Sequence, residues 1–513
     1  MAVAPRPCRI YWLVVFLFLL LSTRSLAEAD LPFLNQTMAD VSRSELASYK
    51  RIIICCDGTW LASDQGDNST PSNVAKLARA IAPNGRDEEG RLVKQIVSYH
   101  SGLGSGDLAT QKALYGGLGW GLDHDVTEIY DFIANNFEPN DELFFFGFSR
   151  GAFTVRSAAA LVSNVGILSA VDMTSFTHMW SAWRAQDNKM PFCESAWYRS
   201  NKNQLHLKNV QVKVVGVWDT VGALSVPRWP VVSWLQKFNI VLNRKYEFHD
   251  TSVSSNIDYA FQTLALDEKR LTFPPTLWHK VDGGPAIALE QCWFPGVHSN
   301  IGGQAEEPLE DTDRGQIGAN TLAWMVSINI DNLSGMLTFE DAAIRAIVDE
   351  HTKALKQNHI PDGWGCGKIV DNFSGWIGRF FWLLGTSVRT PGEYTRDAGT
   401  GKPGATNEYM HPMVRIRRER LKGWTPPSLN RWDYKPKGSG QVVQWSKSGA
   451  EDIPEYKMKA KNITIALATA DGQPRFDTRE SLSRSLCPSR ILSELDAMVA
   501  AREKPLVDGH DEL

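Results

Sequence analysis

Residues 142–151 read ELFFFGFSRG. The apolar run at 142–146 has the composition of a buried strand, and a helix-compatible run follows at 152–161. Between the two runs Ser149 stands in the pattern G-x-S-x-G. A strand, a sharp turn and a helix in this order form a nucleophile elbow, in which Gly147 and Gly151 permit the turn. The sequence therefore predicts that Ser149 is a nucleophile at the carboxyl edge of a sheet, above a helix N-terminus.

A glycine-rich turn can also contain a serine by chance, so the prediction depends on an acid and a histidine later in the chain. Residues 212–218 form a second β-type run, which ends at Asp219. Residues 288–294 form another, which leads into a glycine-rich turn that contains His298. The order serine, acid, histidine, each just past a strand, is the order of α/β-hydrolases. We therefore predict a triad of Ser149, Asp219 and His298.

One rival acid and the oxyanion hole complete the expected site. Asp267 also follows an apolar run, but its neighbour Arg270 favours a structural ion pair for it. An oxyanion hole requires two backbone N–H groups aimed at the developing charge. The first is expected from Arg150, the residue after the nucleophile. The second is expected from Gly58 or Thr59, in an early strand-to-helix loop.

Four segments, in order along the chain, resemble the catalytic domain of the class-one type VI secretion lipase effectors. They are CDGTW at 56–60, GFSRGA at 147–152, VWDTVG at 217–222 and GVHSNIGG at 296–303, with further similar blocks at 266–270, 389–392 and 411–412. The resemblance covers residues 51–417. It implies an α/β-hydrolase fold, phospholipase A activity and a Ser-Asp-His triad, which the matching motifs place at Ser149, Asp219 and His298.

The expected fold class is α/β, an α/β-hydrolase-like central and mostly parallel sheet with helices on both faces. We predict a catalytic domain at 51–417, with a Trp-rich cap insertion around 170–207 and a C-terminal extension at 418–509. Cys55 and Cys56 are neighbours in the first strand and should point to opposite faces. The other elements expected are a strand at 95–99, a helix at 73–82 capped by Ser72 or Asn73, and helices at 126–136 and 491–502.

Both ends of the chain carry targeting signals. In residues 1–27 two arginines, Arg6 and Arg9, precede an apolar core at 10–21, and small residues stand before a cleavage site. This pattern predicts a cleaved signal peptide, followed by a polar leader at 28–50. The apolar core is shorter than the roughly 20 residues that span a bilayer. Residues 510–513 read HDEL, the retrieval address of the endoplasmic reticulum. The expected location is therefore the lumen of that compartment, with the retrieval receptor as a partner.

The composition argues against a nucleic-acid-binding protein, a disulfide-rich protein and a zinc protein. A net charge of −4 and a pI near 6.3 give no basic footprint for nucleic acid. Seven cysteines are too few for a disulfide scaffold, and the pair at 55–56 lacks the spacing of zinc ligands, so no metal is expected. The glycine-rich stretch at 102–106 lacks the last glycine of a dinucleotide fingerprint, and no cofactor is expected. Acceptor sites for N-glycosylation are predicted at Asn35, Asn68, Asn332, Asn372 and Asn462.

Two aromatic stretches suggest how a lumenal hydrolase could reach lipid. Residues 226–235 and 376–384 each combine tryptophans with an arginine, and both are too short to span a membrane. This composition suits a bilayer interface and predicts membrane contact at Trp229, Trp234 and Trp382. Burial in the core or in a pocket wall is the alternative.

The expected function is a serine hydrolase that cleaves carboxylic esters through a covalent acyl-enzyme, with a lipid or small ester as substrate. The resemblance implies a phospholipase A-type or related lipid esterase. Two alternatives remain open: a thioesterase or small-ester hydrolase that uses the same triad, and a non-catalytic lumenal binding protein on the same fold. The sequence does not reveal the regiochemistry of cleavage.

Overall fold

The structure is a computed structural model of residues 1–513. It describes residues 46–58, 71–87, 89–102, 119–185, 192–203, 205–221, 252–280, 288–303, 315–331, 337–357, 363–374, 378–379, 382–383, 385–394, 404–437, 442–458, 465–468, 474–477 and 482–500. By internal contacts the chain divides after Ala47, and the fold below is that of the unit from Ser48 to Leu513.

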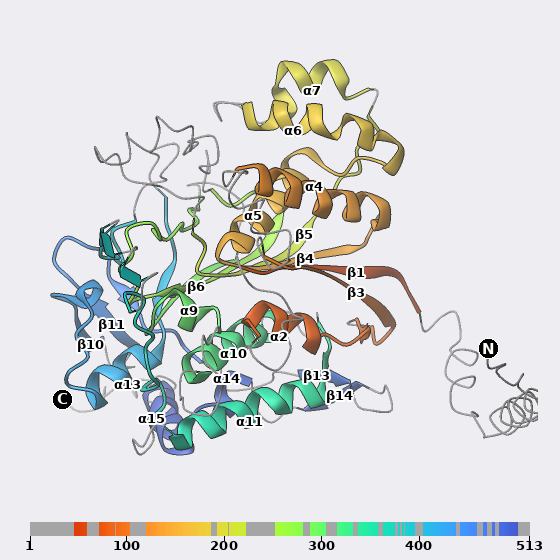
Figure 1. The fold of residues 1–513 in the computed structure, drawn as a ribbon. Coiled ribbons are helices and arrows are strands. Elements are labelled where there is room, and N and C mark those ends of the chain that lie inside the picture. The colour runs from red at the N-terminus through yellow and green to blue at the C-terminus, as the bar shows by residue number, and fades with distance from the viewer. Residues whose placement is uncertain are drawn as a thin grey trace, which may run out of the picture. The chain divides into compact units, whose positions relative to one another are not determined.

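An eight-stranded sheet with the order β2-β3-β1-β4-β5-β6-β7-β9 forms the centre of this unit (Figure 1). Its strands are β1 Leu46–Cys56, β2 Asn84–Arg86, β3 Leu92–His100, β4 Glu142–Phe148, β5 Val212–Trp218, β6 Ile257–Ala265, β7 Ala288–Phe294 and β9 Glu408–Met410. Each neighbouring pair from β1 to β9 is parallel, whereas β2 runs antiparallel to β3. The predicted α/β class with a mostly parallel sheet is confirmed.

Strand residues alternate between two hydrophobic clusters because successive side chains point to opposite faces of a sheet. Ile54 and Cys56 belong to a cluster with α4 (Gly119–Asn136) and α5 (Ser149–Val165). Ile53 and Cys55 belong to the other cluster, with α2 (Asn73–Ala80) and α10 (Gly315–Asp331). Figure 1 shows α4 and α5 on one side of the sheet and α2 and α10 on the other. The expected helices on both faces, and the opposite orientation of the two cysteines, are confirmed.

The Trp-rich insertion forms η3 (Ala170–Ser175), α6 (Phe176–Ala185), η4 (Phe192–Glu194) and α7 (Ala196–Asn201). It packs on the face of the sheet that carries α4 and α5 (Figure 1). The Trp180 ring stacks on Trp183 with centroids 5.3 Å apart, and its indole N–H donates to Asp123 Oδ1 of α4 at 3.0 Å. Trp180 therefore joins this insertion to α4.

The C-terminal part packs into the same core. The predicted boundary after residue 417 lies inside α13 (Pro412–Arg420). Beyond it, the antiparallel strands β10 (Asp433–Lys437), β11 (Val442–Ser446) and β12 (Ile453–Pro454) share a hydrophobic cluster with β7 and β9. The remaining elements are β8 Phe339–Glu340, β13 Ile465–Ala468, β14 Pro474–Asp477, α11 Asp341–Gln357, α14 Leu482–Ser485, α15 Ser489–Ala500 and η7 Pro427–Leu429.

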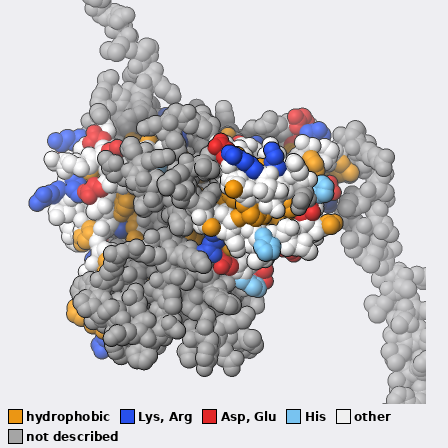
Figure 2. Space-filling model, turned by 90° about the horizontal axis from the view of Figure 1, so that it is seen from above, with side chains coloured by type: hydrophobic (Ala, Val, Ile, Leu, Met, Phe, Trp, Pro, Cys, Tyr) orange, Lys and Arg blue, Asp and Glu red, His pale blue; other side chains and the backbone are white. Residues whose placement is uncertain are grey.

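Charges of both signs are mixed on the described part of the face that Figure 2 shows. On the face in Figure 2, acidic and basic side chains lie interspersed among hydrophobic ones wherever the structure is described. Among the described residues, none of the helices combines the length and the hydrophobicity that a membrane crossing requires.

Candidate active site

Ser149 stands at the junction of β4 and α5, in the left-handed region of backbone conformation with φ of 57°. A non-glycine residue rarely adopts this conformation, and strained residues of this kind cluster at active sites. A Cβ on Gly147 would lie 2.6 Å from the carbonyl oxygen of Gly151, and a Cβ on Gly151 would overlap the carbonyl oxygens of Cys56 and Asp57. Gly147 is therefore required by close packing of β4 against the first turn of α5, and Gly151 by close packing of that turn against the end of β1.

Asp219 and His298 reach Ser149 from two other strands. Asp219 directly follows β5, and His298 begins the short helix α9 (His298–Ile301) after β7. His298 Nδ1 lies 2.6 Å from Asp219 Oδ2, and His298 Nε2 lies 2.8 Å from Ser149 Oγ. All three residues are buried. The structure thus brings the three predicted residues into the hydrogen-bonded order of a Ser-His-Asp triad.

The surroundings set the charge states that a general base needs. Burial lowers the pKa of His298, although the hydrogen bond and the charge of Asp219 oppose this shift. Burial alone would raise the pKa of Asp219, but the charge of Arg389 and the hydrogen bond from His298 hold it well below its usual range. Asp219 is therefore ionised and the imidazole is neutral at pH 7. The hydrogen bonds assign the proton to Nδ1, which leaves Nε2 to accept the serine proton.

Two aromatic rings enclose the imidazole of His298. The ring of Phe148 lies 4.6 Å away between centroids, and the ring of Phe273 meets it edge-on at 5.0 Å. The guanidinium of Arg270 lies over the ring of Phe273, 3.6 Å from its centroid. These apolar walls limit the orientations that the imidazole can adopt, and they remove water from it.

Asp267, the rival acid, has a structural role in this geometry. Its carboxylate accepts the backbone N–H of Gly296 at 2.7 Å and the indole N–H of Trp424 at 2.9 Å. The expected partner of Asp267 was wrong, because Arg270 pairs instead with Glu268, at 2.9 Å. The Asp267 carboxylate therefore stabilises the turn before His298, whereas Glu268 forms the ion pair with Arg270.

The backbone that follows β1 runs beside Ser149. A Cβ on Gly58 would lie 3.2 Å from Cβ of Ser149, so this backbone lies against the Ser149 side chain. The Gly58 N–H donates to Asp57 Oδ1 at 2.8 Å, and Asp57 Oδ2 accepts from Ser72 at 2.5 Å and from Tyr99 at 2.8 Å. Asp57 thus fixes the loop, but it also occupies one predicted oxyanion donor.

The other predicted oxyanion donors are Arg150 and Thr59. Arg150 lies in the first turn of α5, where backbone N–H groups lack partners within the helix. Thr59 lies outside the described residues. Of the predicted donors, the Gly58 N–H is thus already engaged by Asp57.

Residues 50–328 match the family described as "T6SS, Phospholipase effector Tle1-like, catalytic domain". The chain belongs to this family. A curated relative, the uncharacterized protein YEL023C of Saccharomyces cerevisiae, is 27% identical over 219 residues, which are 39% of this chain and 30% of the relative. The chain therefore matches less than a third of the relative's length.

Two solved structures are similar to this Tle1-like chain. The Tle1 effector bound to the VgrG spike of the type 6 secretion system has 21% identity and a TM-score of 0.29, and the match covers 50% of this chain and 51% of that one. An uncharacterized protein from Pseudomonas aeruginosa has 15% identity and a TM-score of 0.32, with 67% and 57% covered.

Sequence reasoning missed two charged residues at the site of this family member. Arg389 forms a buried ion pair with both carboxylate oxygens of Asp219. Glu268 is also buried, and it accepts the backbone N–H of His298 at 3.2 Å and the side-chain amide of Asn372 at 2.7 Å. Both residues lie in blocks that carried the family resemblance, which was the one signal that could have indicated them.

The hydrogen bond from Asn372 to Glu268 affects the predicted glycosylation site at Asn372. Its side-chain nitrogen, the atom that would carry a glycan, already donates to Glu268. The structure therefore disfavours this acceptor site of the Tle1-like chain. The sequons at Asn35, Asn68, Asn332 and Asn462 lie outside the described residues.

Of the three tryptophans predicted to contact a membrane, the structure describes Trp382. Trp382 is 64% exposed, and its neighbour Leu383 is 74% exposed. The alternative of burial is thus excluded for Trp382. Trp229 and Trp234 lie outside the described residues.

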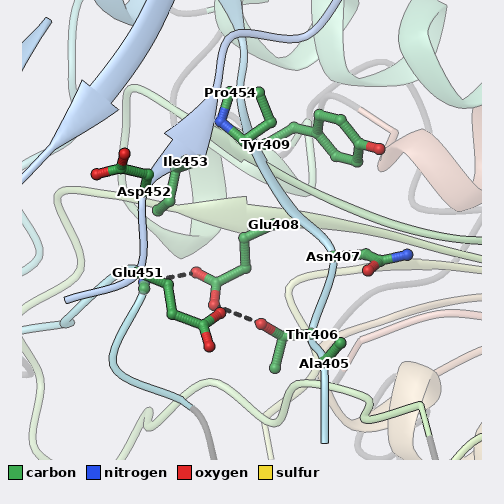
Figure 3. Close-up of a pocket in the computed structure, with 10 residues that line it drawn as sticks. Ala405, Thr406, Asn407, Glu408, Tyr409, Glu451, Asp452, Ile453 and Pro454 are labelled. Carbon is green, nitrogen blue, oxygen red and sulfur yellow. Dashed lines mark hydrogen bonds between the residues drawn. The ribbon is translucent and has the colours of Figure 1, made fainter. Parts of the chain in front are cut away.

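A cavity of about 260 Å³ lies away from the triad, between β9 and β12 (Figure 3). Glu408 lines it, and its carboxyl accepts hydrogen bonds from Thr406, from the Trp293 indole and from the Gly392 backbone. Burial raises the pKa of Glu408. These bonds satisfy both of its oxygens, so this carboxyl acts as a structural acceptor in the Tle1-like fold.

One cluster among the described residues has ligand atoms close enough to hold a metal ion. It consists of His124, Asp125 and Glu128 at the start of α4, with ligand atoms within 4.8 Å of one another. The histidine and the glutamate are exposed, and acidic surface groups of this kind are common without an ion.

Proposed function

We propose that this chain is a serine hydrolase of lipid esters, of the phospholipase A type. The observation that carries the proposal is the hydrogen-bonded line from Asp219 through His298 to Ser149, in a chain of a phospholipase effector family. The elbow strain at Ser149 and the neutral imidazole support it, because both favour a nucleophile with a base in place.

The proposed reaction follows from the position of each atom. His298 Nε2 takes the proton of Ser149 as its oxygen attacks the ester carbonyl, and the Asp219 carboxylate stabilises the resulting imidazolium. Backbone N–H groups, with Arg150 and Thr59 as the proposed donors, stabilise the tetrahedral oxyanion. The imidazolium then protonates the departing alcohol, which leaves an acyl group on Ser149. Water, deprotonated by His298, releases the carboxylic acid and restores the serine.

The substrate class is tested with a panel of esters. The purified chain is incubated with phospholipids that carry different acyl chains at the two glycerol positions, with lysophospholipids and with short-chain esters and thioesters. Release of fatty acid from intact phospholipid supports the proposal, and the identity of the released chain gives the regiochemistry. Turnover confined to short esters or thioesters would instead favour the alternative of a small-ester hydrolase or thioesterase. If no substrate is turned over and Ser149 does not react with a fluorophosphonate, the non-catalytic binding protein is favoured.

An exposed apolar segment supports docking on a lipid surface. Val388 is 50% exposed, like Trp382 and Leu383 before it, and it directly precedes Arg389, the partner of Asp219. Backbone hydrogen bonds join this segment to the residues after β6: Leu271 donates to Gly385, and Ser387 donates to Lys269. Exposed tryptophan and leucine side chains suit a bilayer interface, and this segment leads directly to the arginine that pairs with Asp219.

Replacing Trp382 with serine is expected to weaken binding to phospholipid vesicles and to lower phospholipid turnover. Hydrolysis of a soluble short ester and the melting temperature should stay near the wild-type values, because the side chain is mostly exposed. Vesicle co-sedimentation and both hydrolysis assays measure this. Val171→Ser is the matched control, since Val171 is also exposed but lies in the Trp-rich insertion. Equal losses on both substrates would contradict membrane docking.

We also propose a lumenal location, supported by the signals at residues 1–27 and 510–513, which lie outside the described residues. Deletion of residues 510–513 is expected to release glycosylated protein into the medium. Immunoblots of cells and medium, with and without glycosidase, measure this. Retention of the truncated chain inside the cell would contradict retrieval through the HDEL sequence, and a chain that never acquires glycans would contradict entry into the lumen.

A further inference from the structure

Arg389 is fully enclosed beside the triad acid. Its Nη1 donates to Asp219 Oδ1 at 2.5 Å, and its Nη2 donates to Asp219 Oδ2 at 2.9 Å. Both side chains are buried, with 2% and 0% exposed. This is the fork-to-fork geometry in which an arginine fixes the plane of a carboxylate, which a lysine could not do with a single point charge.

Backbone carbonyls hold the arginine itself in place. Nη1 also donates to the carbonyl of Ala265 at 2.9 Å, and Nη2 donates to that of Phe273 at 3.1 Å. The Ala265 N–H in turn donates to Asp219 Oδ1 at 3.0 Å. The end of β6 thus fixes both the arginine and the carboxylate, so the position of one determines the position of the other.

The backbone conformation of Asp219 explains why such a clamp is useful. Its φ is 43°, in the left-handed region, directly after β5. The carboxylate also shares Oδ2 between Arg389 and His298 Nδ1. A displacement of the carboxylate would therefore carry the imidazole away from Ser149.

We propose that Arg389 is a positioning residue of the triad, which clamps both oxygens of Asp219 so that the carboxylate holds His298 in line with Ser149. The proposal rests on the proposed serine hydrolase function and extends it to a residue outside the triad. Arg389 acts through Asp219, and its effect is therefore on the orientation and the basicity of His298.

The clamp also adjusts the charge that His298 experiences. Four charged groups surround the imidazole: Asp219 and Glu268 are acidic, and Arg270 and Arg389 are basic. Arg389 partly neutralises the carboxylate that would otherwise stabilise the imidazolium. Its removal should raise the pKa of His298, because an opposite charge beside a histidine favours the protonated form.

The expected result for Arg389→Gln is therefore twofold. The acid limb of the pH profile of kcat/KM for a soluble ester should move to higher pH, by roughly one unit. The value of kcat at the optimum should fall about 10²-fold, since a small misplacement of catalytic groups has an effect of this size. KM should change little. Arg389→Lys keeps the charge without the fork, so its acid limb should stay in place while kcat falls.

Arg415 offers a matched control. It also forms a buried bidentate ion pair, in which two nitrogens of Arg415 lie 2.9 and 3.1 Å from the two carboxylate oxygens of Glu455. The exposed fractions of these side chains are 5% and 7%. Arg415→Gln should lower the melting temperature, as any broken buried pair does, but it should leave the pH profile unchanged.

The outcomes separate this inference from the proposed function. An unmoved acid limb in a folded Arg389→Gln chain, with losses no larger than those of Arg415→Gln, would overturn it. If Arg389→Gln does not fold, wild-type kcat in Arg389→Lys would overturn it. The pKa of His298, followed by NMR of ring-labelled histidine in the wild type and in a folded Arg389→Gln chain, needs no substrate and should be higher in the variant. Absence of any ester turnover in the wild type would instead count against the proposed function, while the NMR titration would still report on the clamp.

Discussion

Replacing Ser149 with alanine is expected to reduce ester hydrolysis by about 10⁶-fold, the size of effect found when the nucleophile of a serine triad is removed. Reaction with a fluorophosphonate should be abolished. The variant should remain folded, because alanine is smaller than serine and meets the same left-handed backbone conformation at this position. Stopped-time assays on a short ester and on phospholipid, together with a thermal melt, measure the result.

A second serine on the same helix provides the control for this variant. Ser157 lies in α5 and its hydroxyl donates to the carbonyl of Phe153 at 2.9 Å. Ser157→Ala should retain both hydrolysis and labelling. If Ser149→Ala instead hydrolysed esters at the wild-type rate, another nucleophile would be responsible for the activity.

Replacing Asp219 with asparagine is expected to reduce turnover by about 10⁴-fold, because an amide favours the wrong tautomer of the histidine. The variant also leaves the buried guanidinium of Arg389 without its carboxylate, so we expect a lower melting temperature as well. Activity must therefore be measured below the melting transition and per folded molecule.

Asp267→Asn distinguishes the two candidate acids. Its carboxylate accepts hydrogen bonds from Gly296 and Trp424, so the variant should lose stability while most of the turnover remains. If Asp267→Asn lost as much turnover as Asp219→Asn at equal folded fraction, the assignment of the triad acid would be contradicted.

Local pattern was sufficient to predict the elbow and the order of the triad. The strands before Asp219 and His298 begin and end in the structure where their apolar runs do, at Val212–Trp218 and Ala288–Phe294. An apolar run that stops at a polar residue and a glycine-rich turn gives both the strand and its carboxyl end. Because parallel strands meet at one edge, residues far apart in sequence could be placed together.

Long-range partnership could not be predicted in the same way. Arg389 and Asp219 are 170 residues apart, and no local period relates them. The partner of Arg270 was predicted to be Asp267 rather than the adjacent Glu268, because sequence spacing alone does not say which of two neighbouring carboxyls contacts the arginine. The strand β9, of three residues, is too short to show an alternating pattern, yet it extends the sheet beyond β7.

The tryptophan-rich segments show a further limit of composition. Trp180 and Trp382 occur in similar aromatic surroundings in the sequence, but the first is buried against α4 and the second is mostly exposed. Tryptophan suits both a core and a membrane interface, so only the packing of neighbouring elements separates the two.

The central claim, that Ser149 is the nucleophile of a lipid ester hydrolase, is tested most directly by trapping its covalent adduct. The chain is treated with a fluorophosphonate that carries a long alkyl chain, and the adduct is located by peptide mass spectrometry, with phospholipid hydrolysis followed in parallel. We predict one adduct per chain, on Ser149, formed at the same rate at which phospholipid hydrolysis is lost. An adduct on another residue, or full phospholipid hydrolysis after complete modification of Ser149, would contradict the claim.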